Sequence, residues 1–192
     1  MPRRANTKKA AIVLLIFFLL IINCSPARKN PEHSTLYKNI SAIMTACEKY
    51  SFSISWALAV FFIESSLRAD AVKWEPGPGE DAIGLGQPLL STAQYIRPGA
   101  SREDLLNPEY NADVCVAHLS NLLKKHSGNY EHALREYNGG NNWKKKDNRK
   151  YYIAVKHARD RILTQKVNYE KYFIYGYYFI VCSEFMGKRL DR

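Results

Sequence analysis

The chain has 192 residues, enough for one domain with a substantial hydrophobic core and a short additional segment at either end. Lys and Arg outnumber Asp and Glu by 28 to 18, and the resulting net charge of +10 favours anionic partners. The sequence nevertheless shows no zinc-ligand spacing, no arginine-rich arm and no aromatic RNA-binding signature, which argues against nucleic acid as a partner.

The N-terminal residues 1–24 are typical of an export signal or membrane anchor. Basic residues precede an apolar stretch over residues 10–22, which is short for a membrane span of about 20 residues and fits a signal-peptide core. Cys24 follows in "IINCSP", which resembles a bacterial lipobox with Asn23 in place of the usual small residue. Lipidation of Cys24, an uncleaved anchor and a cleaved signal with an incidental cysteine all remain open. Each places an exported protein in the cell envelope, and lipidation or an uncleaved anchor also ties it to a membrane, facing the periplasm or cell wall.

The cysteine pattern gives no support to a metal or redox centre. Apart from Cys24, three cysteines remain, and this odd number allows one disulfide with a free thiol or no disulfide; they are Cys47, Cys115 and Cys182. The chain has no C-x-x-C pair. We therefore expect neither a metal nor a cofactor.

Helical patterns begin after residues 25–34, a polar segment with two prolines that predicts a tether. Apolar residues then recur at spacings of four, three and four, which predicts a helix with one apolar face: Leu36, Ile40, Ile43 and Cys47. Ser53 is a candidate N-cap for the following segment, "ISWALAVFFIE". Because that segment is apolar almost all round, it predicts a helix that runs through the core.

The rest of the chain also predicts helices rather than strands. Residues 70–83 contain "EPGPGED" and predict a loop, and "STAQYI" from Ser91 indicates a short helix. Asn107 and Pro108 predict the N-cap and first residue of the next helix. "YEHALREYNGG" and "NRKYYIAVKHARDRIL" predict two more, and we find no convincing strand alternation. We therefore expect a mainly α domain over residues 35–165.

Two further features are expected to lie outside the chemistry of the domain. His118 and His126 have no partner histidine at ligand spacing, so we expect them to be exposed or to cap a helix. Residues 166–192 include "YEKYFIYGYYFIVCSEF", an aromatic-rich segment too short to span a bilayer. A final core helix and an aromatic surface at the membrane interface would both fit this tail.

Candidate chemistry begins with Glu64 in "FFIESSLRAD", one carboxylate at the end of the most apolar helix. Burial raises the pKa of a carboxyl and can make it an acid catalyst, whereas a position facing water leaves it ordinary. Gly84 and Gly86 follow in "AIGLGQPLLSTA", where a G-x-G-x-x-G phosphate site fails because Leu89 holds the last Gly position. Such glycines let the backbone approach something closely, for instance a ligand.

Tyr137 and Asn138 lie at a predicted helix end in "EYNGG" and offer hydrogen-bonding groups. The chain resembles the lytic transglycosylase domain of the soluble type over about residues 36–160. The motifs that carry the resemblance are, in chain order, "ESS", "GLGQ" with "STA", N-P-x-x-N, "ALREYNGG" and "YYIAVKHA". The family's Glu-Ser pair matches Glu64 and Ser65. Its G-L-M-Q and A-Y-N motifs match with Gly86 in place of Met and Glu136 in place of Ala, and Leu90 replaces a family Pro.

This resemblance implies a mainly α, goose-lysozyme-like fold and an enzyme that cleaves the β-1,4 bond between N-acetylmuramic acid and N-acetylglucosamine in peptidoglycan. Glu64 is implied as the catalytic acid, and the product as a 1,6-anhydro end. Gln87 and Asn138 are implied to hold sugar groups, Tyr137 to orient Glu64, and Ser65 to position Glu64 or its loop. The implied partners are peptidoglycan glycan strands, together with a membrane through the N-terminal anchor; protein partners are not indicated.

Two other functions fit the same sequence. A lysozyme-type hydrolase on this fold needs a water molecule and usually a second carboxylate, for which the intervening loop offers four candidates: Asp70, Glu75, Glu80 and Asp81. A non-catalytic wall-binding or assembly module is the other alternative, and the presence of Glu64 argues against it.

Overall fold

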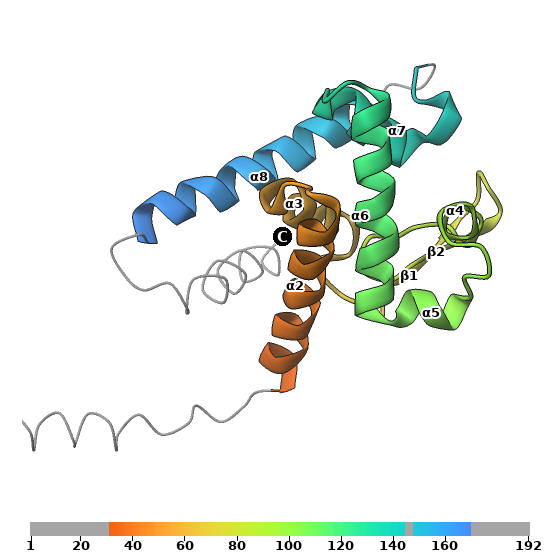
Figure 1. Cartoon of the computed structure of the whole chain (residues 1–192), viewed down its shortest axis with the longest axis horizontal. Coiled ribbons are helices and arrows are strands. Elements are labelled where there is room, and N and C mark those ends of the chain that lie inside the picture. Colours follow the sequence, from red (N-terminus) through yellow and green to blue (C-terminus); the bar gives the residue numbers. More distant parts are fainter. Residues whose placement is uncertain (1–30, 145–147, 170–192) are drawn as a thin grey trace, which may run out of the picture. The chain divides into compact units, whose positions relative to one another are not determined.

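The computed structural model describes residues 31–144 and 148–169 (Figure 1). The chain divides into two units, residues 1–34 and 35–192, and the description below concerns the second unit. The predicted signal with Cys24, most of the tether, Cys182 and nearly all of the aromatic tail lie outside the described residues. Within the described part of the chain, no helix is both long enough and apolar enough to span a bilayer.

Helices make up most of the described residues, which confirms the mainly α prediction. They are α2 (Pro31–Tyr50), α3 (Ile54–Ser65), α4 (Leu90–Ile96), α5 (Arg102–Leu106), α6 (Pro108–Lys125), α7 (Tyr130–Gly139), the 3-10 helix η1 (Gly140–Asn142) and α8 (Arg149–Tyr169). The predicted cap at Asn107 is confirmed, because its side chain accepts a hydrogen bond of 3.0 Å from the Tyr110 backbone N–H. Helix α5 was not predicted, although Ser101 and Asp104 form a capping box at its start.

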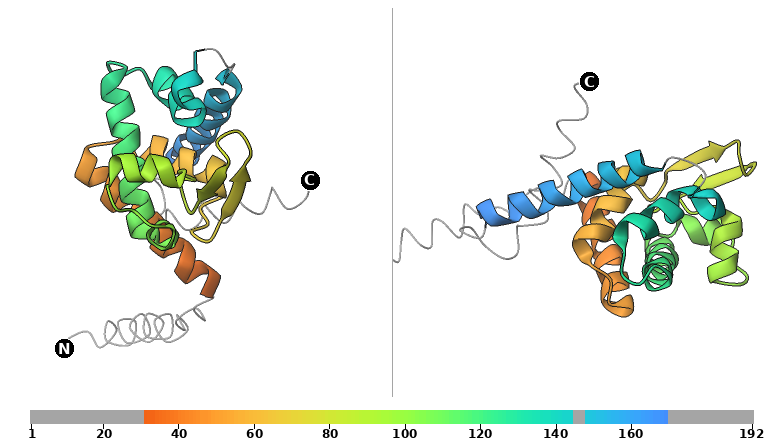
Figure 2. Two further views of the ribbon diagram at one scale, coloured as in Figure 1. Left: turned by 90° about the vertical axis from the view of Figure 1, so that its right-hand side faces the viewer. Right: turned by 90° about the horizontal axis from the view of Figure 1, so that it is seen from above.

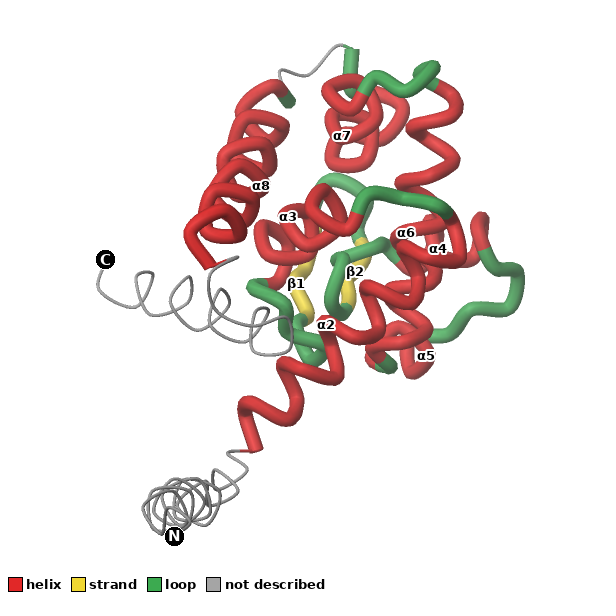
Figure 3. Tube along the Cα trace, turned by 60° about the vertical axis from the view of Figure 1, so that its left-hand side comes forward, coloured by secondary structure: helices red, strands yellow, loops and turns green. Residues whose placement is uncertain are grey.

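Helix α3 forms the centre of the main core, as its uniformly apolar sequence predicts. Buried side chains of α2, α6, α7 and α8 gather round it, and Val60 and Phe61 have no exposed surface. Figure 3 shows α3 lying against α8. Full burial of a large apolar side chain stabilises the folded state by about 1.5–3 kcal/mol. The end of this helix, where Glu64 lies, is therefore a rigid platform for a functional group.

The prediction of a loop over residues 70–83 is wrong, because the segment forms a β-hairpin. Strand β1 (Val72–Glu75) pairs antiparallel with β2 (Glu80–Ile83), and Trp74 lies opposite Asp81. The residues of β1 do alternate apolar and polar, but over four positions only, and the Pro- and Gly-rich turn that follows them favours a loop. Seen from above, the hairpin extends beyond the helices (Figure 2).

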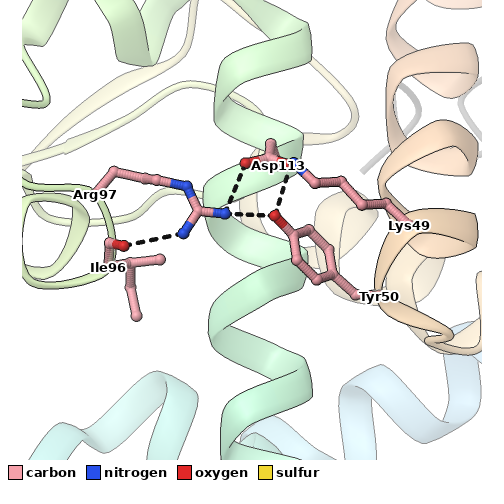
Figure 4. A network of polar contacts seen from close by, with 5 residues as sticks. All are labelled: Lys49, Tyr50, Ile96, Arg97 and Asp113. Carbon is pink, nitrogen blue, oxygen red and sulfur yellow. Dashed lines mark hydrogen bonds and ion pairs between the residues drawn. The ribbon is translucent and has the colours of Figure 1, made fainter.

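A polar network ties the end of α4 to α2 and α6 (Figure 4). Asp113 on α6 accepts hydrogen bonds from Lys49 (2.5 Å), Tyr50 (2.8 Å) and Arg97 (3.0 Å), and Arg97 also donates to the Tyr50 hydroxyl. Burial opposes ionisation of Asp113, but these three donors outweigh it and hold its pKa below the usual value. The network fixes α4 and so the loop that precedes it.

Candidate active site

Glu64 lies in the last turn of α3, directly before an unusual helix end. Ser66 and Leu67 are both in the left-handed region, with φ of 56° and 63°. That conformation costs a residue other than Gly about 1 kcal/mol or more, so the surroundings must hold it. Buried Asn39 of α2 does so in part, since its Nδ2 donates a 2.9 Å hydrogen bond to the Leu67 carbonyl. The direction in which the chain leaves Glu64 is thereby fixed.

The Glu64 carboxyl is held in a protonatable state by its surroundings. Burial raises its pKa from 4.5 to about 7, and the charge of Glu75 adds to the rise. A hydrogen bond from Tyr151, at 2.5 Å to Oε1, and the charge of Lys73 oppose it. This rise agrees with the expectation for a carboxyl at the end of the apolar helix, and near neutral pH the group can both give and take a proton.

Replacing Tyr151 with Phe is expected to raise the pKa of Glu64 further, because the lost hydrogen bond stabilises the ionised carboxylate. NMR titration of the labelled Glu64 carboxyl measures the change. Tyr152→Phe is the matched control, since the adjacent ring stacks on Trp56 and its hydroxyl has no hydrogen bond to another described residue. An unchanged Glu64 titration in Tyr151→Phe contradicts the assigned contact.

Tyr137 does not orient Glu64, so that prediction is wrong. Its hydroxyl donates a 2.7 Å hydrogen bond to the Gly86 carbonyl, and Tyr151 of α8 takes the position on Glu64. Both tyrosines stand in segments that carry the family resemblance, but local sequence does not show which ring faces the acid. The signal that could have found Tyr151 is the quoted "YYIAVKHA" helix.

The loop over residues 84–87 is fastened to the helices at three points. The Ser65 hydroxyl donates to the Leu85 carbonyl at 2.7 Å, Tyr137 holds Gly86 as described, and the Gly86 N–H donates to Asn111 Oδ1 at 2.9 Å. Ser65 thus lies where it positions the loop, one of its two expected roles, and its hydroxyl faces protein. Asn111, the last residue of the quoted N-P-x-x-N, was not predicted as part of the site.

The two loop glycines come close to protein rather than to open space for a ligand. A Cβ on Gly84 would lie 2.3 Å from both Asn111 Nδ2 and the Leu105 carbonyl oxygen. A Cβ on Gly86 would lie 2.5 Å from Cys115 Sγ. The backbone at these glycines does approach its neighbours closely, as expected, but the neighbours are α5 and α6 rather than a ligand. The glycines allow the loop to pack against these helices.

Gln87 and Asn138 present amide groups at the margins of this site. Gln87, at φ 52°, donates from Nε2 to the carbonyls of Ala71 (3.1 Å) and Gly84 (2.8 Å), and its Oε1 accepts no hydrogen bond from the described residues. Asn138 is exposed at the end of α7, and its side chain has no partner within the described part of the chain. Both amides keep capacity for an external ligand.

The two histidines are less exposed than expected. His118 is partly buried beside the Tyr137 ring, and burial lowers its pKa to about 4, so it is neutral near pH 7. His126 is the C-cap of α6, which confirms the capping alternative, but its Nε2 lies 2.7 Å from the buried carboxylate of Glu136. Among residues with described side chains, no group of three His, Cys, Asp or Glu residues could hold a metal ion. Cys47 and Cys115 are buried free thiols.

Comparisons with known proteins agree with this geometry. A family model described as the transglycosylase SLT domain matches residues 41–159. The fold is similar to that of an inactive mutant of the lytic transglycosylase Slt from Pseudomonas aeruginosa, with a TM-score of 0.55 and 24% sequence identity. That match covers 67% of this chain and 24% of the other, so this chain spans about a quarter of the length of Slt. No curated protein matches.

Proposed function

The chain belongs to the transglycosylase SLT domain family, and we propose that it is a peptidoglycan lytic transglycosylase in which Glu64 is the catalytic acid and base. The observation that carries the proposal is the carboxyl of Glu64, whose pKa of about 7 lets one group serve in both protonation states. The bond cleaved is the β-1,4 bond between N-acetylmuramic acid and N-acetylglucosamine.

In the first step the neutral Glu64 donates its proton to the glycosidic oxygen as the bond from C1 of the muramic acid to that oxygen breaks. The leaving sugar departs with a new hydroxyl group. The positive charge that develops at C1 is stabilised by the carbonyl oxygen of the substrate's own N-acetyl group. This substrate group takes the place of the second carboxylate that ordinary glycosidases need.

In the second step Glu64, now a carboxylate, takes the proton of the C6 hydroxyl as that oxygen attacks C1. A 1,6-anhydro ring forms, Glu64 is protonated again, and no water is consumed. The Tyr151 hydroxyl supports the first step rather than this one, because its hydrogen bond favours the ionised carboxylate that forms when Glu64 gives up its proton. Gln87 and Asn138 would hold hydroxyl or N-acetyl groups of the sugars with their available amide groups.

Digestion of purified peptidoglycan, followed by mass analysis of the soluble fragments, tests the proposal. We expect fragments with anhydro ends, which are lighter by one water than the corresponding hydrolysis products. Fragments with reducing ends alone would assign the chain to lysozyme-type hydrolysis. Intact peptidoglycan, with Glu64 present and the protein folded, would favour a non-catalytic wall-binding module.

The hydrolase alternative now depends on Glu75. It is the one carboxylate of the four loop candidates whose charge contributes to the pKa shift of Glu64. Asp81 pairs with Arg102 at 2.5 Å, and Glu80 accepts a hydrogen bond from Ser91. Glu75 is itself paired with Lys73 at 2.6 Å, which reduces its availability as a general base.

Glu75→Gln is therefore expected to keep the anhydro products and to change the cleavage rate by no more than a few fold. A base or nucleophile in a hydrolase is worth about 10²–10⁴-fold, so a loss of that size would identify Glu75 as the second carboxylate. Glu80→Gln is the control, because Glu80 has the same chemistry but its charge is not among the causes of the Glu64 pKa shift. Rates are measured as release of soluble fragments at several pH values.

We also propose that the protein is exported and anchored in the cell envelope through lipidated Cys24. The basis is the position of this cysteine directly after an apolar segment of signal-peptide length. Intact-mass measurement of the native protein is expected to show loss of residues 1–23 and a lipid adduct, and Cys24→Ala is expected to lack the adduct. A native chain that retains its first residues without an adduct contradicts the proposal.

A further inference from the structure

Trp74 differs from the other two tryptophans of the chain in its exposure. Trp56 and Trp143 are each 8% exposed and belong to packed clusters of rings, whereas Trp74 is 59% exposed. It lies on strand β1 of the hairpin that extends beyond the helices (Figure 2). An exposed Trp on a projecting element is available as an anchor for a ligand, and Trp is enriched among residues that carry binding energy.

The residues on either side of Trp74 connect it to Glu64. Lys73 and Glu75 precede and follow it, and the charges of both act on the Glu64 carboxyl. Successive side chains of a strand point to opposite faces, so Trp74 projects from the face away from these two. Trp74 is therefore flanked by two residues that act on Glu64, while its own ring occupies the other face of the hairpin.

The face that carries Trp74 also offers polar groups. Asp81 lies directly opposite Trp74 in the register, and its carboxylate pairs with Arg102 of α5 at 2.5 Å. Arg102 is 44% exposed in its side chain. Val72, two residues along the same face, is 43% exposed. This surface therefore combines the exposed Trp74 ring with a hydrogen-bond donor, Arg102, and an acceptor, Asp81.

We propose that Trp74 is a stacking platform for a sugar ring of the peptidoglycan glycan strand, at a position beyond the bond that is cleaved. A pyranose ring has an apolar face of C–H groups that lies flat on an aromatic ring, and a rim of hydroxyl groups that Arg102 and Asp81 can bind. The occupant follows from the position of Trp74 between Lys73 and Glu75, the two residues of β1 that act on Glu64, and the inference thus rests on the proposed function.

Fluorescence tests the platform directly, because Trp74 is the exposed tryptophan. The 192-residue chain carrying Glu64→Gln binds without cleaving, and acrylamide quenching is measured with and without peptide-free glycan strands. We expect the strands to shield an exposed emission component, and Trp74→Phe to remove that component. Unchanged quenching at glycan concentrations that saturate binding overturns the inference.

Affinity gives a second, independent readout. In the Glu64→Gln chain, Trp74→Ala is expected to weaken binding of glycan strands about tenfold, the effect of losing one aromatic stacking contact. Tyr95→Ala is the matched control, since Tyr95 on α4 is 84% exposed and should leave the affinity unchanged. Equal affinity in the Trp74 variant, with its circular dichroism spectrum intact, overturns the platform.

The remaining outcomes distinguish a glycan platform from a membrane-binding ring and from a wall-binding module without activity. Vesicles of anionic phospholipid are the alternative probe, and shielding of Trp74 by vesicles but not by glycan would assign the ring to a membrane surface and overturn the proposal. Anhydro products from the wild-type chain without shielding of Trp74 would refute the platform alone. Shielding by glycan without any cleavage by the wild-type chain would refute the enzymatic proposal and leave the platform as a wall-binding site.

Discussion

Glu64→Gln is expected to lower the rate of peptidoglycan cleavage by at least 10²-fold while the fold is retained. Gln has nearly the shape of Glu, so it fits the same position at the end of α3. It cannot donate and recover a proton, and general acid–base catalysis is worth about 10²–10⁴-fold. The loss should appear in the rate at saturating substrate, with glycan binding changed little. Release of soluble fragments, measured over time, gives the rate.

Glu109→Gln is the control for this change, because Glu109 is 54% exposed on α6 and pairs with Lys38 at the surface. Its cleavage rate should match that of the wild type. Retained cleavage in Glu64→Gln, with folding verified by circular dichroism, contradicts the assignment of Glu64 as the acid.

The same variant is expected to become more stable relative to the wild type as the pH rises from about 4.5 to 7. The folded-state pKa of Glu64 is raised from 4.5 to about 7, so in this range the folded protein binds more protons than the unfolded chain. The contribution of Glu64 to stability therefore falls as pH rises, and Gln removes that penalty. The full difference is on the order of 3 kcal/mol. Paired denaturant unfolding curves across the range measure it, and a flat difference would mean an ordinary, solvated carboxylate.

Gly84→Ala is expected to destabilise the fold by roughly 3 kcal/mol or more and to abolish activity with it. Gly84 has φ of 74°, where a Cβ is strained in any case. The added carbon would also meet the Leu105 carbonyl oxygen and Asn111 Nδ2 at 2.3 Å. The backbone carbonyl cannot move away alone, and displacing Asn111 would break its 2.8 Å hydrogen bonds to the carbonyls of Ile83 and Leu105. Buried groups left without partners add a further cost.

Gly79→Ala separates the two causes. Gly79 also has φ of 74°, but nothing lies within 4 Å of its Cβ position. We expect Gly79→Ala to lower the free energy of unfolding by about 1–2 kcal/mol, the cost of the backbone conformation alone. Equal losses in the two variants, measured as free energies of unfolding, would show that the contacts with α5 and α6 do not constrain the loop.

Features encoded within one or two helical turns could be read from the sequence. Asn107 and Pro108 predict the start of α6 because a cap and a fixed φ act on the next few residues alone. The unbroken apolar run of α3 predicts a core helix because burial on all sides requires it. The hairpin could not be read in this way. Strand β1 alternates apolar and polar residues over only four positions, and the Pro- and Gly-rich turn beside it has the composition of a loop.

Within the site, the sequence by itself determined which residues are candidates for catalysis and binding, and the family motif singles out Glu64 without reference to any contact. The tertiary structure decided how they meet. Tyr151, 87 residues away from Glu64, lies on its carboxyl, while Tyr137 holds the Gly86 carbonyl instead. Such contacts depend on how α3, α7 and α8 pack, and no local pattern records them. The pKa of Glu64 is likewise a property of the packed fold, because desolvation comes from neighbours that are distant in the chain.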